Sequence, residues 1–264
     1  MFVLVSEFLF IIFRYDLFSL SLFPLAIGTH CLQRQVHLTS ATGQDCQTEQ
    51  LGELWTSASQ MTCYWQCVAR YPDTCQSIIY NASTGTCTPG GVAFSPLEFF
   101  KSSIPAANSP DTIYYVEQPS PRCYDTFSLH KKCGFSLCLH IHTSSTASYA
   151  KARAQCDKIK SRLFVGNTIA RLSLFWHATL ESRRKVYWIG LTDLDHEGQF
   201  VWENGEILSK QQKQYIWHPG QPDNHGNDEY CAEARPKSNW NQGLCDNGCH
   251  NNKFYVCESY AQTS

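Results

Sequence analysis

The sequence predicts a disulfide-rich α+β protein of an oxidising, extracellular compartment. The chain has 264 residues and 14 cysteines, an even number that is too high for a reducing compartment. Segments with apolar residues at helical spacing alternate with short strand-like segments, which favours the α+β class. The length suits one large domain or two small ones.

The composition narrows the classes of function. The formal net charge is −2, which argues against nucleic acid as a partner and gives no sign of a basic membrane-binding surface. The segment Asn81-Ala82-Ser83 is an acceptor sequence for N-glycosylation at Asn81. Together with the cysteine content, this sequence predicts a secreted glycoprotein.

Residues 1–28 are expected to form a signal peptide. Residues 2–27 are largely apolar, but the charged residues Glu7, Arg14 and Asp16 interrupt them and make a poor membrane span. The apolar run 17–27 ends in small residues suited to cleavage near Gly28. Cleavage there would leave no membrane span, and the alternative is an uncleaved anchor.

Residues 29–121 are expected to form a small disulfide module followed by a connector. Residues 57–71 are predicted to form a helix capped by Ser57 or Ser59, and residues 76–80 a strand. The proline-rich and serine-rich residues 102–121 suit an extended connector.

The cysteines of this module follow the spacing Cys63-x3-Cys67-x7-Cys75-x11-Cys87. This pattern around a helix and a strand resembles the PAN/apple family. The resemblance implies the disulfides Cys63–Cys87 and Cys67–Cys75. PAN/apple modules bind proteins or glycans, so a protein partner or oligomer contact through this module is one expectation, and a disulfide-stapled spacer is the other.

Residues 122–260 are predicted to form a second α+β domain. Its first helix is marked by apolar residues at helical spacing, namely Tyr149, Ala152, Cys156 and Ile159. Asn167 is a candidate cap for a second helix with the stripe Ile169, Leu172, Trp176 and Leu180. Residues 186–191, 199–202 and 254–257 are predicted to be strands. Trp188, Trp202 and Trp217 are interpreted as core or loop-anchoring residues.

A loop before Cys231 carries the strongest functional signal. Gln221-Pro222-Asp223 places an amide and a carboxylate on either side of a proline, and Glu229 adds a second acid. Asn241, downstream of Cys231, adds a second amide if Cys231 bonds to Cys245. Oxygen ligands of mixed charge suit a hard cation such as Ca²⁺. They also suit a sugar, because each hydroxyl both donates and accepts a hydrogen bond.

These residues resemble the C-type lectin family over residues 123–259. The motifs occur in the family's order: Trp188-Ile189-Gly190-Leu191, Glu197 to Trp202 with Asn204-Gly205, Trp217 to Asn224, Trp240-Asn241, and Val256-Cys257-Glu258. The resemblance implies a C-type lectin-like fold with two helices, antiparallel strands and a long binding loop. It also implies a carbohydrate-binding protein rather than an enzyme.

The resemblance implies part of the disulfide pattern. Cys156–Cys257 would close the domain and Cys231–Cys245 would brace the binding loop. An additional pair would join Cys123 to Cys138, with Cys133 as the other candidate partner. A pairing of Cys133 with Cys249 is a guess, and Cys31 and Cys46 have no assigned partner, since connectivity does not follow from sequence.

The resemblance also implies a calcium-dependent sugar site. Gln221, Asp223, Glu229, Asn241 and Gln242 take the positions of the Ca²⁺ ligands, with a cis peptide bond at Pro222. The first four of these and His225 take the sugar-binding positions. The order Gln-Pro-Asp resembles members that prefer galactose, so glycans with terminal galactose or related sugars are the expected partners.

Two positions depart from the family's pattern. Gln242 stands where the family has an aspartate, which leaves Asp223 and Glu229 as the carboxylates of the predicted site. His225 stands where galactose-binding members have a larger aromatic residue. The alternative hypothesis is therefore a lectin-like protein-interaction molecule that has lost its calcium site.

Overall fold

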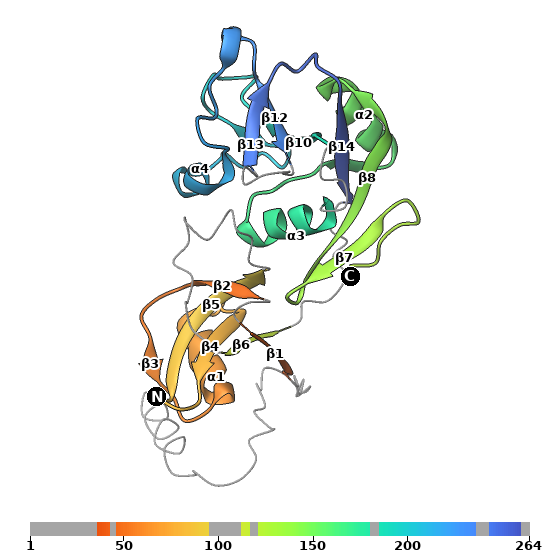
Figure 1. Cartoon of the computed structure of the whole chain (residues 1–264). Helices are drawn as coiled ribbons and strands as arrows, with labels where there is room; N and C mark the ends of the chain where they lie inside the picture. Colours follow the sequence, from red (N-terminus) through yellow and green to blue (C-terminus); the bar gives the residue numbers. More distant parts are fainter. Residues whose placement is uncertain are drawn as a thin grey trace, which may run out of the picture. The chain divides into compact units, whose positions relative to one another are not determined.

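A computed structural model describes residues 36–42, 46–94, 112–116, 121–179, 185–235 and 243–259 (Figure 1). The predicted signal peptide, most of the predicted connector, and the predicted ligands Asn241 and Gln242 lie outside these residues. Contacts divide the chain into residues 1–37 and residues 38–264, and every element named below belongs to the second unit. The predicted boundary between residues 121 and 122 stays a prediction.

A sheet with the order β1-β6-β4-β5-β2 is formed by residues of the predicted N-terminal module, and β3 pairs with β5. Its strands are β1 Leu38–Thr42, β2 Gln47–Gln50, β3 Trp55–Thr56, β4 Ser77–Asn81, β5 Thr86–Phe94 and β6 Thr112–Val116, all paired antiparallel. The predicted helix is α1 Gln60–Arg70. The side chain of Ser59 caps it by accepting a hydrogen bond from the Thr62 amide at 3.1 Å.

Two disulfides fix α1 to this sheet. Cys63 and Cys67 lie one turn apart on the buried face of the helix. Cys63 bonds to Cys87 on β5, and Cys67 bonds to Cys75, just before β4. Both bonds are the expected ones.

The C-terminal domain contains the longer sheet, with the order β13-β12-β10-β14-β8-β7. Its strands are β7 Ser128–Lys132, β8 Phe135–Ala147, β9 Ser161–Leu163, β10 Tyr187–Thr192, β11 Val201–Trp202, β12 Cys231–Arg235, β13 Gly243–Asn247 and β14 Lys253–Ser259. β10 and β14 are parallel, whereas β12 and β13 form an antiparallel pair next to β10 (Figure 1).

Among the described residues, three α-helices accompany this sheet: α2 Tyr149–Lys158, α3 Ile169–Thr179 and α4 Lys210–Ile216. The predicted apolar face of α2 is buried at Tyr149, Ala152 and Cys156. At the start of α3, the Thr168 hydroxyl rather than Asn167 accepts from the Arg171 amide, so the predicted cap is one residue too early. The short helix α4 begins with a capping box between Ser209 and Gln212.

The core of the C-terminal domain is rich in aromatic residues. Trp188, Trp202 and Trp217 are buried, as interpreted from the sequence, and none is a surface platform. The indole of Trp188 donates to the Ala147 carbonyl at 2.9 Å, which satisfies its polar group inside the core.

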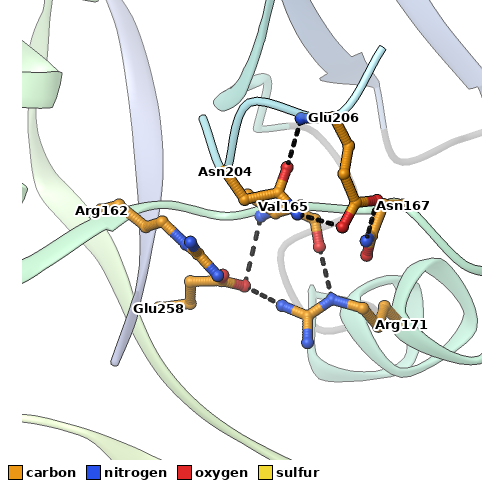
Figure 2. Close-up of polar contacts among 7 residues, drawn as sticks. All are labelled: Arg162, Val165, Asn167, Arg171, Asn204, Glu206 and Glu258. Carbon is orange, nitrogen blue, oxygen red and sulfur yellow. Dashed lines mark hydrogen bonds and ion pairs between the residues drawn. The ribbon is translucent and has the colours of Figure 1, made fainter. Parts of the chain in front are cut away.

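A buried carboxylate connects the last strand to the start of α3 (Figure 2). Glu258 on β14 is 2% exposed and accepts from the Arg162 guanidinium at 2.7 Å, the Val165 amide at 3.2 Å and the Arg171 guanidinium. Arg171 also donates to the Val165 carbonyl at 2.6 Å. Removal of one partner from a buried ion pair of this kind is destabilising, because it leaves the other charge uncompensated.

The disulfides of the C-terminal domain agree with expectation at Cys156–Cys257 and Cys123–Cys138. The pairings Cys231–Cys245 and Cys133–Cys249 are wrong. Cys231 bonds to Cys249 with a Cα–Cα distance of 5.2 Å, and Cys133 bonds to Cys46.

The register of β12 and β13 explains the error at Cys231. Cys231 lies opposite Asn247, whereas Cys245 lies opposite Glu233, two residues further along β12. Cys249 follows Asn247 by two residues and comes within bonding distance of Cys231. Cys245 is buried and has no disulfide among the described residues.

Candidate functional site

The candidate site lies where the loop between α4 and β12 meets the end of β13. The loop begins at the buried Trp217, and the His218 amide donates to the Leu244 carbonyl on β13 at 2.8 Å. The Gln221–Pro222 peptide bond is cis, as expected. Asn224 and Gly226 have positive φ angles of 40° and 73°, so the chain turns sharply between Asp223 and Glu229.

Three carboxylates meet in this loop. One oxygen each from Asp223, Glu229 and Asp246 lies within 4.8 Å of the other two. Asp223 is exposed, Glu229 is partly buried and Asp246 is buried. The sequence prediction included Asp223 and Glu229 but missed Asp246.

Asp246 on β13 organises the loop around itself. Its two carboxylate oxygens accept from the backbone amides of Asp223 at 3.1 Å and Asn224 at 2.7 Å. The side chain of Gln221 connects the same groups, because its carbonyl accepts from the Asp246 amide at 3.2 Å and its amide donates to Asp223 at 2.8 Å. The two residues that flank Pro222 are therefore held beside Asp246.

Glu229 is placed by the turn that precedes it. Its carboxylate accepts from the His225 amide at 2.9 Å, and its own amide donates to the Asn224 side chain at 3.1 Å. Partial burial raises the pKa of Glu229, and the charges of Asp246 and Asp223 raise this pKa further, against the opposing hydrogen bond from the His225 amide. The carboxylates therefore repel one another.

A second buried acid stands near this cluster. Asp193 is 2% exposed, accepts from the Gly198 amide at 2.8 Å, and has a second carboxylate oxygen without a hydrogen-bond partner among the described residues. Burial raises the pKa of Asp193, and the charges of Glu197 and Asp246 add to this effect. Its amide donates to the Tyr230 carbonyl at 3.1 Å, next to Glu229.

The donor set fits a hard divalent cation. Ca²⁺ binds carboxylate, amide and backbone oxygens, which are the groups that Gln221, Asp223, Glu229 and Asp246 offer. Burial raises the pKa of the neighbouring Cys245 thiol to about 11, and Ca²⁺ takes oxygen rather than sulfur ligands. A cation would relieve the repulsion among the three carboxylates.

The predicted site residues divide into two groups. Gln221, Asp223 and Glu229 come together, and the exposed His225 lies on the turn His225–Asn227 beside them. Asn241 and Gln242 lie outside the described residues, and their roles stay predictions.

The sequence held a signal for Asp246, since an acid and an amide, Asp246-Asn247, stand shortly before Cys249. The motif Trp240-Asn241 led instead to the prediction that Asn241 and Gln242 are the ligands.

Comparison with known proteins finds matches over the part of the chain that contains this site. The family model described as the lectin C-type domain matches residues 145–259. Perlucin from Haliotis laevigata is 31% identical over 116 residues, which cover 42% of this chain and 70% of perlucin. Hepatic lectin from Gallus gallus is 32% identical over 114 residues, which cover 43% of this chain and 51% of hepatic lectin.

Other matches cover less of the relative or are more distant. The chain spans 23% of C-type lectin domain family 4 member K from Mus musculus, at 38% identity over 81 residues. Among solved structures, the mouse scavenger receptor C-type lectin carbohydrate-recognition domain is 23% identical, with a TM-score of 0.44 over 53% of this chain and 100% of that domain. The family model and the match over most of perlucin show that the chain belongs to the C-type lectin domain family, whose domains bind carbohydrates, are not enzymes and generally bind Ca²⁺.

Proposed function

We propose that the chain is a secreted lectin that binds galactose-type sugars through one Ca²⁺. The ion would be held by Gln221, Asp223, Glu229 and Asp246. The observation that carries the proposal is the approach of three carboxylate oxygens to within 4.8 Å of one another on a loop braced by the Cys231–Cys249 disulfide. Asn241 and Gln242 remain further candidate ligands.

The sugar would complete the coordination of the ion. Two neighbouring hydroxyls of a sugar can each bind the cation, donate to a carboxylate and accept from an amide. Gln221 and Asp223 supply such an amide and carboxylate side by side, joined by a hydrogen bond of 2.8 Å. Their order, amide first and acid second, supports galactose rather than mannose.

His225 would contribute the contact with the apolar face of the sugar. Its side chain is exposed on the turn beside Glu229, whose carboxylate the His225 amide contacts. An imidazole offers less area than an indole, so we expect weak binding to a single sugar and stronger binding to clustered glycans.

The third carboxylate favours calcium binding over the alternative of a calcium-independent interaction molecule. That alternative depended on the neutral Gln242 and on a site with two carboxylates. Asp246 supplies a third carboxylate to the cluster. A higher ligand charge favours Ca²⁺.

The remaining regions of the chain are assigned by the same proposal. Residues 1–28 would be a signal peptide, and among the described residues no helix is long and apolar enough to cross a membrane. Residues 29–121 would be a PAN/apple-like module that contacts a protein partner or a second copy, and residues 122–260 the lectin domain. The Asn81 side chain, on which the glycan would be carried, accepts from the Ser83 hydroxyl at 2.6 Å.

Affinity chromatography tests the proposed activity. The full chain should be retained on immobilised galactose in the presence of calcium and eluted by a calcium chelator. The Asp228→Asn variant should be retained and eluted in the same way as the unmodified chain. Asp228 is exposed and contacts His250 at 3.5 Å rather than the carboxylate cluster. Retention that a chelator leaves unchanged, or no retention on any sugar resin, contradicts the proposal.

A further inference from the structure

Two histidines on β8 form a pair that the proposed lectin site does not use. His140 and His142 alternate with Ile141, so their side chains stand on the same face of the strand. Their ring centroids are 6.1 Å apart. Both side chains are partly exposed and therefore accessible to a solute.

The hydrogen bond of His140 defines which nitrogen is available. The Nδ1 atom lies 2.7 Å from the Thr126 carbonyl oxygen. Since a carbonyl only accepts, Nδ1 donates, and in the neutral ring Nε2 keeps its lone pair. Histidines that bind metals are commonly oriented in this way, with the other ring nitrogen donating to a backbone carbonyl.

His142 is held in place by its neighbours. Its ring stacks on that of Tyr255 at a centroid distance of 4.4 Å and an interplanar angle of 14°. Its Nε2 atom lies 3.0 Å from the Ser145 hydroxyl and 3.1 Å from the Ser144 hydroxyl. In the neutral tautomer whose Nε2 donates to these hydroxyls, the lone pair that could bind a metal lies on Nδ1.

The separation of the two rings suits a shared ion. With a metal–nitrogen bond of about 2.1 Å, the centre of a ligating imidazole lies roughly 3.2 Å from the ion, so two such rings have centres up to about 6.4 Å apart. The observed 6.1 Å lies within this reach. A tetrahedral angle at the ion would place the two ring centres roughly 5.2 Å apart, so the rings would have to approach each other by about 1 Å on binding.

We propose that His140 and His142 are ligands of a site for a divalent transition-metal ion, and that the ion is Zn²⁺. Imidazole nitrogen suits Zn²⁺, whereas Ca²⁺ requires oxygen ligands, so this site and the carboxylate cluster select different ions. Water molecules complete the coordination of the ion. The site is independent of sugar binding and does not rest on the proposed function.

Calorimetric titration of the full chain with zinc chloride tests the proposal, with calcium in excess so that oxygen ligands are occupied. We expect one zinc ion per chain, and at least tenfold weaker binding in His140→Gln and in His142→Gln. The control variant His37→Gln removes an exposed imidazole elsewhere and should bind zinc as the unmodified chain does. Equal zinc affinity in all four proteins, or no binding by the unmodified chain, overturns the proposal.

A second measurement avoids dependence on the variants folding. Of the ten histidines, two should show zinc-dependent shifts of their imidazole proton signals in the NMR spectrum of the unmodified chain. Unshifted imidazole signals at saturating zinc overturn the proposal as well.

Discussion

At the scale of single residues, Asp246 changes the account of the site most. It is a buried acid on a strand, and it accepts from the backbone amides of Asp223 and Asn224. A loop sequence can show which residue types are present, but not which strand residue reaches into the loop. The ligands near Pro222 were predictable because they are adjacent in sequence, whereas Asp246 depends on the register of β12 and β13.

Exchange of the two residues that flank Pro222 tests the predicted sugar preference. The double variant Gln221→Glu with Asp223→Asn keeps one carboxylate and one amide, so the net charge and their mutual hydrogen bond can be retained. Only the positions of donor and acceptor are exchanged. We expect the ratio of galactose to mannose affinity to fall at least tenfold, about 1.4 kcal/mol, in competitive binding with both monosaccharides. An unchanged ratio with calcium binding intact contradicts the assignment of these side chains to sugar recognition.

The buried Asp193 should affect the pH dependence of stability. Its folded pKa is raised, so its favourable contribution is present below its ordinary pKa of 3.8 and is lost as the pH rises through the folded value. Asp193→Asn should therefore gain stability relative to the unmodified chain at neutral pH, and this gain should shrink as the pH falls toward 4. Denaturant unfolding with a chelator present measures this difference, and Asp195→Asn, an exposed acid two residues away, is the control. A pH-independent difference between Asp193→Asn and the unmodified chain would argue against a raised pKa.

At the scale of the elements, the spacing of apolar residues predicted the buried faces of the helices better than the residues at which the helices begin and end. The buried face of α2 followed from Tyr149, Ala152 and Cys156, because a period of 3.6 residues is visible in sequence. The helix α4 escaped prediction because its seven residues bury only Tyr215 and Ile216, which is too short a stripe to show a period. The start of α3 was misplaced because Asn167 and Thr168 are both good caps, and Asn167 instead donates to Glu206 at 2.7 Å.

The link between β14 and α3 should contribute strongly to stability (Figure 2). Glu258→Gln leaves the Arg162 and Arg171 guanidinium groups without their buried charge partner. We expect the free energy of unfolding to fall by about 3 kcal/mol, measured by denaturant unfolding. Glu206→Gln in the same region is the matched control, because Glu206 is exposed and should change stability by less than about 0.5 kcal/mol. Equal effects of both variants would show that the Glu258 network is not stabilising.

At the scale of the whole molecule, the disulfides show which cysteine pairings can be predicted from the sequence and which cannot. The family patterns predicted Cys63–Cys87 and Cys123–Cys138, and also Cys156–Cys257, which spans 101 residues. Cys46–Cys133 spans 87 residues and joins the residue before β2 to the turn between β7 and β8. No local pattern contains that information, since it depends on how distant segments meet.

Direct titration of calcium tests the central claim most sharply. Calorimetry on the full chain should show one Ca²⁺ bound with an affinity near the ~10⁻⁴–10⁻³ M of extracellular modules. Asp246→Asn should weaken this affinity at least tenfold, because it removes a carboxylate from the cluster of three, while Asp228→Asn should leave it unchanged. Absence of calcium binding in the millimolar range, or equal affinities for Asp246→Asn and the unmodified chain, would contradict the account.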